Sequence, residues 1–180
     1  MADKYGKCLI HNPGKFPFEF QGKGKNDPKD IVPGVKATHL MTVDESKQKG
    51  FFTVDCSWLW SGAAKAPVGE THTHDFSHVL GFIGGCEEDP QDLAGEITLT
   101  LDGNRETLKR NALVFVPAGV AHGPIMFNKI TRPVFFITIA MAGKYSKKAV
   151  VMPGKALPKK YTIIDHTKER FSVGGDFKEA

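Results

Sequence analysis

The sequence is poor in cysteine and lacks a long apolar run. Its three cysteines, Cys8, Cys56 and Cys86, are an odd number at unrelated spacings without a Cys-x-x-Cys pair. This argues against a disulfide framework and against a cysteine-based zinc site. The first residues lack the apolar core of a secretory signal, and no run reaches the length of a membrane span. We therefore expect a cytoplasmic protein with free thiols and no association with membranes.

A continuous stripe of positive charge is also missing. The formal net charge is +4, but the lysines are scattered, many of them in the two terminal segments. Nucleic-acid binding is therefore not expected. What the chain does have is a hydrophobic fraction of 41%, with 13 phenylalanines among 180 residues. That is enough apolar material for one domain with a core of ordinary size.

Short apolar or alternating runs fill the middle of the chain. Residues 96–101 alternate strictly and lead into Asp102-Gly103-Asn104, which is typical of a tight hairpin turn. Similar runs recur from 38 to 140, and no long stretch has a helical period. The pattern predicts an all-β barrel or sandwich. We expect an N-terminal extension over 1–35, the barrel over 36–145 and a C-terminal extension over 146–180.

Four histidines are the most informative residues. His72, His74 and His78 lie within eight residues, and His122 follows the turn sequence that begins at Pro117. The even spacing of the first three places them on one face of an extended chain, whereas a helix would turn His72 away from the other two. For a single histidine, a surface position or a hydrogen-bonded core position is the better interpretation. Four together predict a transition-metal site.

Two motifs in this region resemble those of the cupin superfamily. The first reads, in words, a glycine, five residues, His-x-His, three or four residues, a glutamate, six residues and a glycine. His72, His74, His78 and Gly85 fit that frame, with His78 in place of the glutamate and Ala66 in place of the leading glycine.

The second cupin motif is a glycine, five residues, Pro-x-Gly, two residues and a histidine. Asn111, Pro117, Gly119 and His122 occupy this frame. Asparagine in place of the first glycine is mild, because it tolerates a left-handed backbone better than most residues.

The resemblance implies a cupin-type, jelly-roll β-barrel with extensions at both ends and a divalent transition metal held by His72, His74, His78 and His122. Replacing a glutamate by His78 leaves the ion's charge uncompensated and favours anionic chelating ligands. Fe(II) is our first choice of metal, with Ni, Mn, Zn and Cu as the others. Similar proteins commonly form dimers, so we also expect a homodimer.

The expected function is oxidation of a small chelating organic molecule by a mononuclear non-haem enzyme of the dioxygenase type. Two alternatives stay open: a redox-neutral metal-dependent lyase or isomerase, and a non-catalytic cupin that binds a small ligand or a metal.

Four further residues are weaker candidates for the site. Glu70 has the same parity as His72 and could point inward as a general base; the alternative is a rim residue paired with a lysine. Leu80 and Phe82 follow His78 on its face, and Met126 shares parity with His122, so these three could line an apolar substrate pocket. The alternative for all three is ordinary barrel core.

Overall fold

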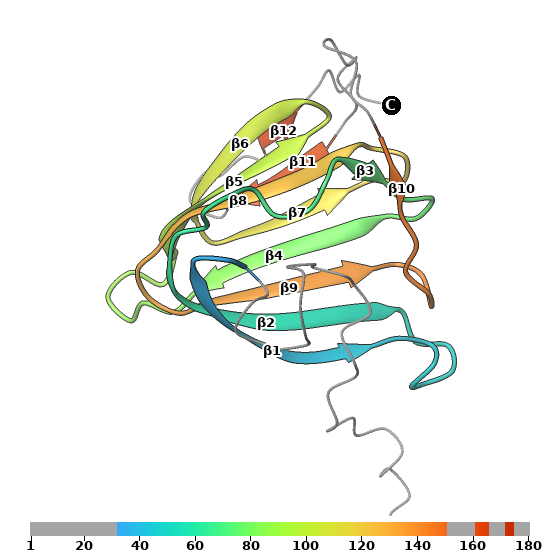
Figure 1. The fold of residues 1–180 in the computed structure, drawn as a ribbon, viewed down its shortest axis with the longest axis horizontal. Coiled ribbons are helices and arrows are strands. Elements are labelled where there is room, and N and C mark those ends of the chain that lie inside the picture. Colours follow the sequence, from blue (N-terminus) through green and yellow to red (C-terminus); the bar gives the residue numbers. More distant parts are fainter. Residues whose placement is uncertain (1–31, 151–160, 166–171, 175–180) are drawn as a thin grey trace, which may run out of the picture.

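The structure is a computed structural model that describes residues 32–150, 161–165 and 172–174. The described residues contain twelve β-strands and no helix. Seven strands form a first group of hydrogen-bonded neighbours, in the order β1, β2, β9, β4, β7, β11, β12 (Figure 1). Their bounds are β1 Val35–Val43, β2 Thr53–Gly62, β9 Val134–Ala140, β4 His78–Gly84, β7 Ala112–Val116, β11 Tyr161–Asp165 and β12 Ser172–Gly174.

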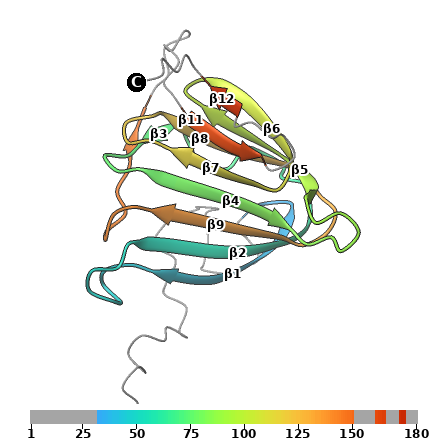
Figure 2. The ribbon, with the colours of Figure 1, turned by 180° about the vertical axis from the view of Figure 1, so that it is seen from behind.

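A second group of five strands packs against the first. Its order is β6, β5, β8, β3, β10, and the two groups are joined where Gly62 of β2 pairs with Ile130 of β8. All the pairings are antiparallel, and together they make a nearly closed β-barrel, which confirms the predicted all-β fold. Figure 2 shows the ladder of the first group from behind. The bounds are β6 Asn104–Arg110, β5 Asp92–Leu101, β8 His122–Ile130, β3 His72–Thr73 and β10 Lys148–Ala149.

The interior of the barrel follows the alternation of the sequence. On β4, His78, Leu80 and Phe82 are 4%, 3% and 0% exposed, whereas Ile83 is 42% exposed on the other face. The predicted hairpin is also present, because β5 and β6 meet at Asp102 and Gly103, which both have positive φ angles of 49° and 82°. Left-handed φ at both turn residues is the requirement of a type I′ turn, which aspartate and glycine meet at low cost.

The predicted C-terminal extension contributes strands to the barrel. β10 pairs with β3, and β11 pairs with β7. The N-terminal extension predicted over 1–35 lies almost wholly outside the described residues, so its boundary stays a prediction. Cys56 and Cys86 are free thiols as expected, whereas Cys8 lies outside the described residues. Among the described residues, no helix is long and apolar enough to cross a membrane.

Asn111 has a role that differs from the one predicted. It is not among the residues with positive φ, so tolerance of a left-handed backbone does not explain it. Instead its side chain accepts a hydrogen bond from the Gly84 amide at 2.7 Å and donates to the Pro90 carbonyl at 2.8 Å. Asn111 therefore ties the start of β7 to the end of β4.

The end of β4 offers a matched test of packing. A Cβ added to Gly84 would lie 2.5 Å from backbone atoms of Asp92 and Leu93, whereas a Cβ on Gly85 would meet nothing within 4 Å. Backbone cannot move aside as a flexible side chain can, so we expect Gly84→Ala to lower the free energy of unfolding by about 1–3 kcal/mol. Gly85→Ala should have little effect. Urea denaturation followed by tryptophan fluorescence measures both variants, and equal midpoints would contradict this packing.

Candidate metal centre

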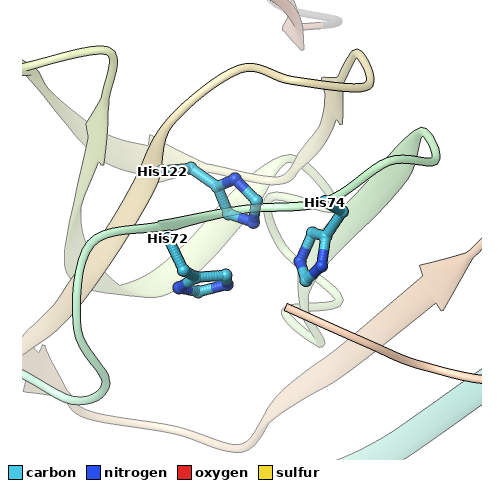
Figure 3. A group of neighbouring side chains, drawn as sticks. All are labelled: His72, His74 and His122. Atoms are coloured by element: carbon cyan, nitrogen blue, oxygen red, sulfur yellow. The ribbon is translucent and has the colours of Figure 1, made fainter. Parts of the chain in front are cut away.

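The structure brings the four predicted histidines together at one end of the barrel. His72 lies on β3 and His74 just after it, while His78 and His122 begin β4 and β8. The ring centroids of His72 and His122 are 4.4 Å apart, and each of these rings is 4.9 Å from that of His74. Figure 3 shows these three rings turned toward a common space.

The first three histidines do not lie on one straight strand, as the even spacing suggested. β3 ends at Thr73, a bend follows at Asp75 and Phe76, and β4 begins at His78. The turn of the second motif holds this bend in place, because the Gly119 amide donates a 2.7 Å hydrogen bond to the His74 carbonyl. The convergence of the rings thus depends on contact between the two motifs as well as on strand alternation.

The Nδ1 atoms of three histidines are all engaged by backbone carbonyls. His72 Nδ1 donates to Glu70 O at 2.7 Å, His74 Nδ1 to Ser146 O at 2.5 Å and His122 Nδ1 to Val120 O at 3.0 Å. A carbonyl can only accept, so each Nδ1 carries the ring hydrogen and each Nε2 keeps a lone pair. This is the tautomer needed to ligate a metal through Nε2, with the carbonyls fixing the orientation of the rings.

Histidines 72, 74 and 122 form a group whose potential ligand atoms all lie within 4.8 Å of one another. His78 is their immediate neighbour, with its Nδ1 3.5 Å from His122 Nε2. Among the described residues, the buried His74 Nε2 and His78 Nε2 have no hydrogen-bond partner. Unsatisfied buried lone pairs are costly, and a cation bound between the rings would satisfy them. The residues therefore fit a divalent transition metal.

Comparison with known proteins adds only distant structural similarity. No family model and no curated protein matches the chain. Among solved structures, a polyketide cyclase from Streptomyces resistomycificus is 19% identical, with a TM-score of 0.42 over 68% of this chain and 78% of that one. An oxalate decarboxylase variant from Bacillus subtilis is 14% identical (TM-score 0.41; 66% and 28% covered), and a vicilin from Corylus avellana is 13% identical (TM-score 0.41; 66% and 33% covered). The chain spans about a third or less of the latter two proteins.

The strand pairing of this chain and its two motifs carry the assignment. Its antiparallel strands close into a barrel, and histidines from both motifs meet inside one end of it. This arrangement agrees with the barrel fold that the resemblance of the two motifs to cupins implies.

Burial keeps the imidazoles of the candidate centre neutral. It lowers the pKa of His74 to about 4 and that of His122 to about 3, and it lowers the pKa of His72 as well. The pKa of His78 is held well below its ordinary value by burial and by the neighbouring His122. Only neutral imidazoles can ligate a metal, so the site is prepared for a cation over the whole neutral range.

A segment that sequence analysis missed covers the centre. We call residues 144–150 the strap; it follows β9 and includes β10. Within it, the Tyr145 ring lies 4.7 Å from the His74 ring, which also stacks on the Phe76 ring at 4.7 Å, and the Tyr145 and Phe76 rings are themselves 6.0 Å apart. Burial raises the pKa of the Tyr145 hydroxyl, so this residue stays protonated at neutral pH. The lysine-rich strap has no motif, so only its proximity in the fold reveals it.

Glu70 points away from the centre. Its side chain is 57% exposed and its Oε1 lies 3.1 Å from Lys147 Nζ of the strap. The predicted inward direction required a straight strand through Glu70, but β3 begins only at His72 and Gly69 has a φ of 78°. The structure thus matches the alternative of a rim residue paired with a lysine. The backbone of Glu70 still contributes the carbonyl that orients His72.

The three candidate pocket residues separate into two groups. Leu80 and Phe82 lie on the inner face with His78, as predicted, and both belong to the hydrophobic core. Met126 does not share the face of His122, because a register shift between Leu99 and Leu101 interrupts the alternation of β8. Met126 pairs with Thr98, so Ile125 takes the inner position beside Leu99.

Acid should destabilise the protein after its metal has been removed. The histidine pKa values lie below the ordinary 6.5 when folded, so the unfolded chain binds protons that the folded chain does not bind. We expect the melting temperature of chelator-treated protein to be highest above about pH 7 and to fall between about pH 6.5 and 4. The double variant His74→Asn, His122→Asn should have a shallower dependence. A constant melting temperature down to pH 5 would contradict the lowered pKa values.

Proposed function

We propose that this protein is a metal-dependent cupin enzyme that acts on a small chelating organic molecule. His72, His74 and His122 would hold one divalent transition metal, with His78 as the fourth ligand. The observation that carries the proposal is the set of buried imidazoles whose Nδ1 atoms are engaged by carbonyls while His74 Nε2 and His78 Nε2 have no partner in the described structure. Such an arrangement has little structural purpose without a cation.

The four imidazole ligands support a chelating anion as substrate. Four neutral imidazoles leave the full charge of a divalent ion uncompensated, and four protein ligands leave up to two positions open on an octahedral ion. Carboxylate, 2-oxo acid and enediol groups match both properties. Fe(II) remains our first choice of metal, with Ni, Mn, Zn and Cu as alternatives, because imidazole accepts all of them.

Oxidation with dioxygen is the proposed reaction type. A bound redox-active ion would supply electron transfer to dioxygen, and a redox-inert ion would supply Lewis acidity alone. The protein's contribution is to exclude water and hold the ligands. The Phe76 and Tyr145 rings both pack against the His74 ring, and Tyr145 stays protonated beside it. Leu80 and Phe82 provide an apolar inner wall below His78.

The redox-neutral alternative, a lyase or isomerase, requires a group that moves a proton. Glu70 was the sequence-based candidate, but in this role its carboxylate would have to leave Lys147 and turn inward. That requirement favours the oxidative proposal. In the non-catalytic alternative, the ion would serve ligand binding or storage, and loss of metal would affect ligand affinity without any turnover.

The remaining expectations stay proposals. We propose a cytoplasmic homodimer that binds neither nucleic acid nor membrane. Ile83 and Leu113, two exposed hydrophobic residues on β4 and β7, support an association surface on the outside of the first strand group. Light scattering that gives the mass of one chain would remove the dimer.

Metal content tests the centre directly. Protein purified without a nickel column should contain about one equivalent of transition metal per chain by elemental analysis. His74→Ala and His122→Ala should each lower occupancy at least tenfold at a fixed low metal concentration. Asp75→Asn changes an exposed residue between the ligands and should retain metal. Full occupancy in both histidine variants would refute the centre, and iron rather than zinc in the native protein would favour oxidation.

A further inference from the structure

Polar side chains also line the inside of the first strand group, away from the four clustered histidines. Thr42 of β1 and Asp55 of β2 face each other, each 3% exposed, and Thr42 Oγ1 donates a 2.5 Å hydrogen bond to Asp55 Oδ2. His39 Nε2 donates to the same oxygen at 2.8 Å. Thr138 of β9 pairs directly with Asp55. We call these four residues the polar wall.

The polar wall and the metal centre share the barrel interior. Asp55 pairs with Thr138, and Thr138 pairs with Leu80, two residues along β4 from His78. Directly paired residues of antiparallel strands point to the same side, and Leu80 belongs to the core. Asp55 therefore faces inward with His78. It lies two strands away from β4, which ordinary strand spacing makes about 10 Å.

Thr138 is less fully buried than its neighbours on the inner face of β9. Its neighbours on the same face of β9, Phe136 and Ala140, are 6% and 2% exposed. Thr138 keeps partial exposure although it lies on a central strand between β2 and β4. Thr138 therefore keeps surface on the inner face that a ligand can contact.

Asp55 has unused capacity as an acceptor. The hydrogen bonds from His39 and Thr42 both end on Oδ2. A carboxylate has room for about four donors, and a buried one is costly when its acceptors are not used. A buried carboxylate with a purely structural role could be replaced by apolar packing at little cost in stability.

We propose that the polar wall binds a hydroxyl group of the ligand whose other end chelates the metal. The hydroxyl would donate to Asp55 and interact with the Thr138 hydroxyl. The substrate class is then a small acid or 2-oxo acid with a hydroxyl at the far end from the chelating group, a phenol being the compact rigid case. This inference rests on the proposed function, because it takes the metal centre as the first anchor.

Two chelators that differ by a single hydroxyl test the wall. Benzohydroxamate and 4-hydroxybenzohydroxamate both offer a bidentate chelating group on a rigid ring, and calorimetry with Co(II)-loaded protein gives the affinity of each. We expect the hydroxylated compound to bind about tenfold more tightly, the usual gain from a hydrogen bond to a charged group. Asp55→Asn and Thr138→Val should each reduce this preference to about twofold or less without changing the affinity for benzohydroxamate.

Thr98→Val is the matched control. Thr98 is 5% exposed, and its hydroxyl is bonded to Thr107 and Asn128 on the face that bears Met126. This variant should keep the tenfold preference, and Thr138→Val carries the test if Asp55→Asn does not fold.

Equal affinities of the two chelators for the unaltered protein, or a preference that survives both wall variants, would overturn the polar wall and leave the metal centre standing. Failure to bind Co(II) or either chelator would overturn the proposed function and the wall with it.

Discussion

Four desolvated imidazoles that cannot all be satisfied by the protein are the constraint on which this structure depends. Protonation of the rings would not remove the cost of their unpaired nitrogen atoms. The rings lie within about 5 Å of one another, and like charges at that spacing in a buried site repel strongly. Hydrogen bonding cannot relieve them either, because each of the three carbonyl partners occupies Nδ1 and leaves Nε2 facing the other rings. A shared cation resolves both problems at once.

The carbonyls that impose this arrangement come from three separate parts of the chain. Glu70 precedes β3, Val120 lies in the turn before β8, and Ser146 belongs to the strap. The strap is held by β10 pairing with β3 and by the Lys147–Glu70 ion pair. The C-terminal part of the chain therefore helps to orient His74 of the first motif. The candidate metal centre depends on the whole end of the barrel, even though its histidines come from two short motifs.

The features that could be predicted from the sequence are those that depend on local pattern. Strand alternation predicted the inner face of β4, the sequence Asp102-Gly103-Asn104 predicted the β5–β6 turn, and the two motifs predicted that their histidines would lie together. The errors occurred where one extra residue or a bend broke the pattern. A register shift in β8 moved Met126 off the inner face, and a late start of β3 left Glu70 outside. The contact of Tyr145 with His74 depends on the path of a chain segment that has no periodicity, so no sequence rule could have found it.

The distribution of charge inside the barrel determines how a ligand would be oriented there. Neutral ligands would leave a divalent ion with its full positive charge at the end formed by β3, β4 and β8, while the described carboxylate that faces inward, Asp55, lies across the interior on β2. A ligand that is anionic at both ends would meet repulsion at Asp55, and a cationic one would be repelled by the ion. The best match is a molecule with a negative chelating group at one end and a neutral hydrogen-bond donor at the other. Shape alone could not impose this orientation on a small planar acid, but a cation at one end and a buried hydrogen-bond acceptor at the other can, because electrostatic interactions are strong where water is excluded.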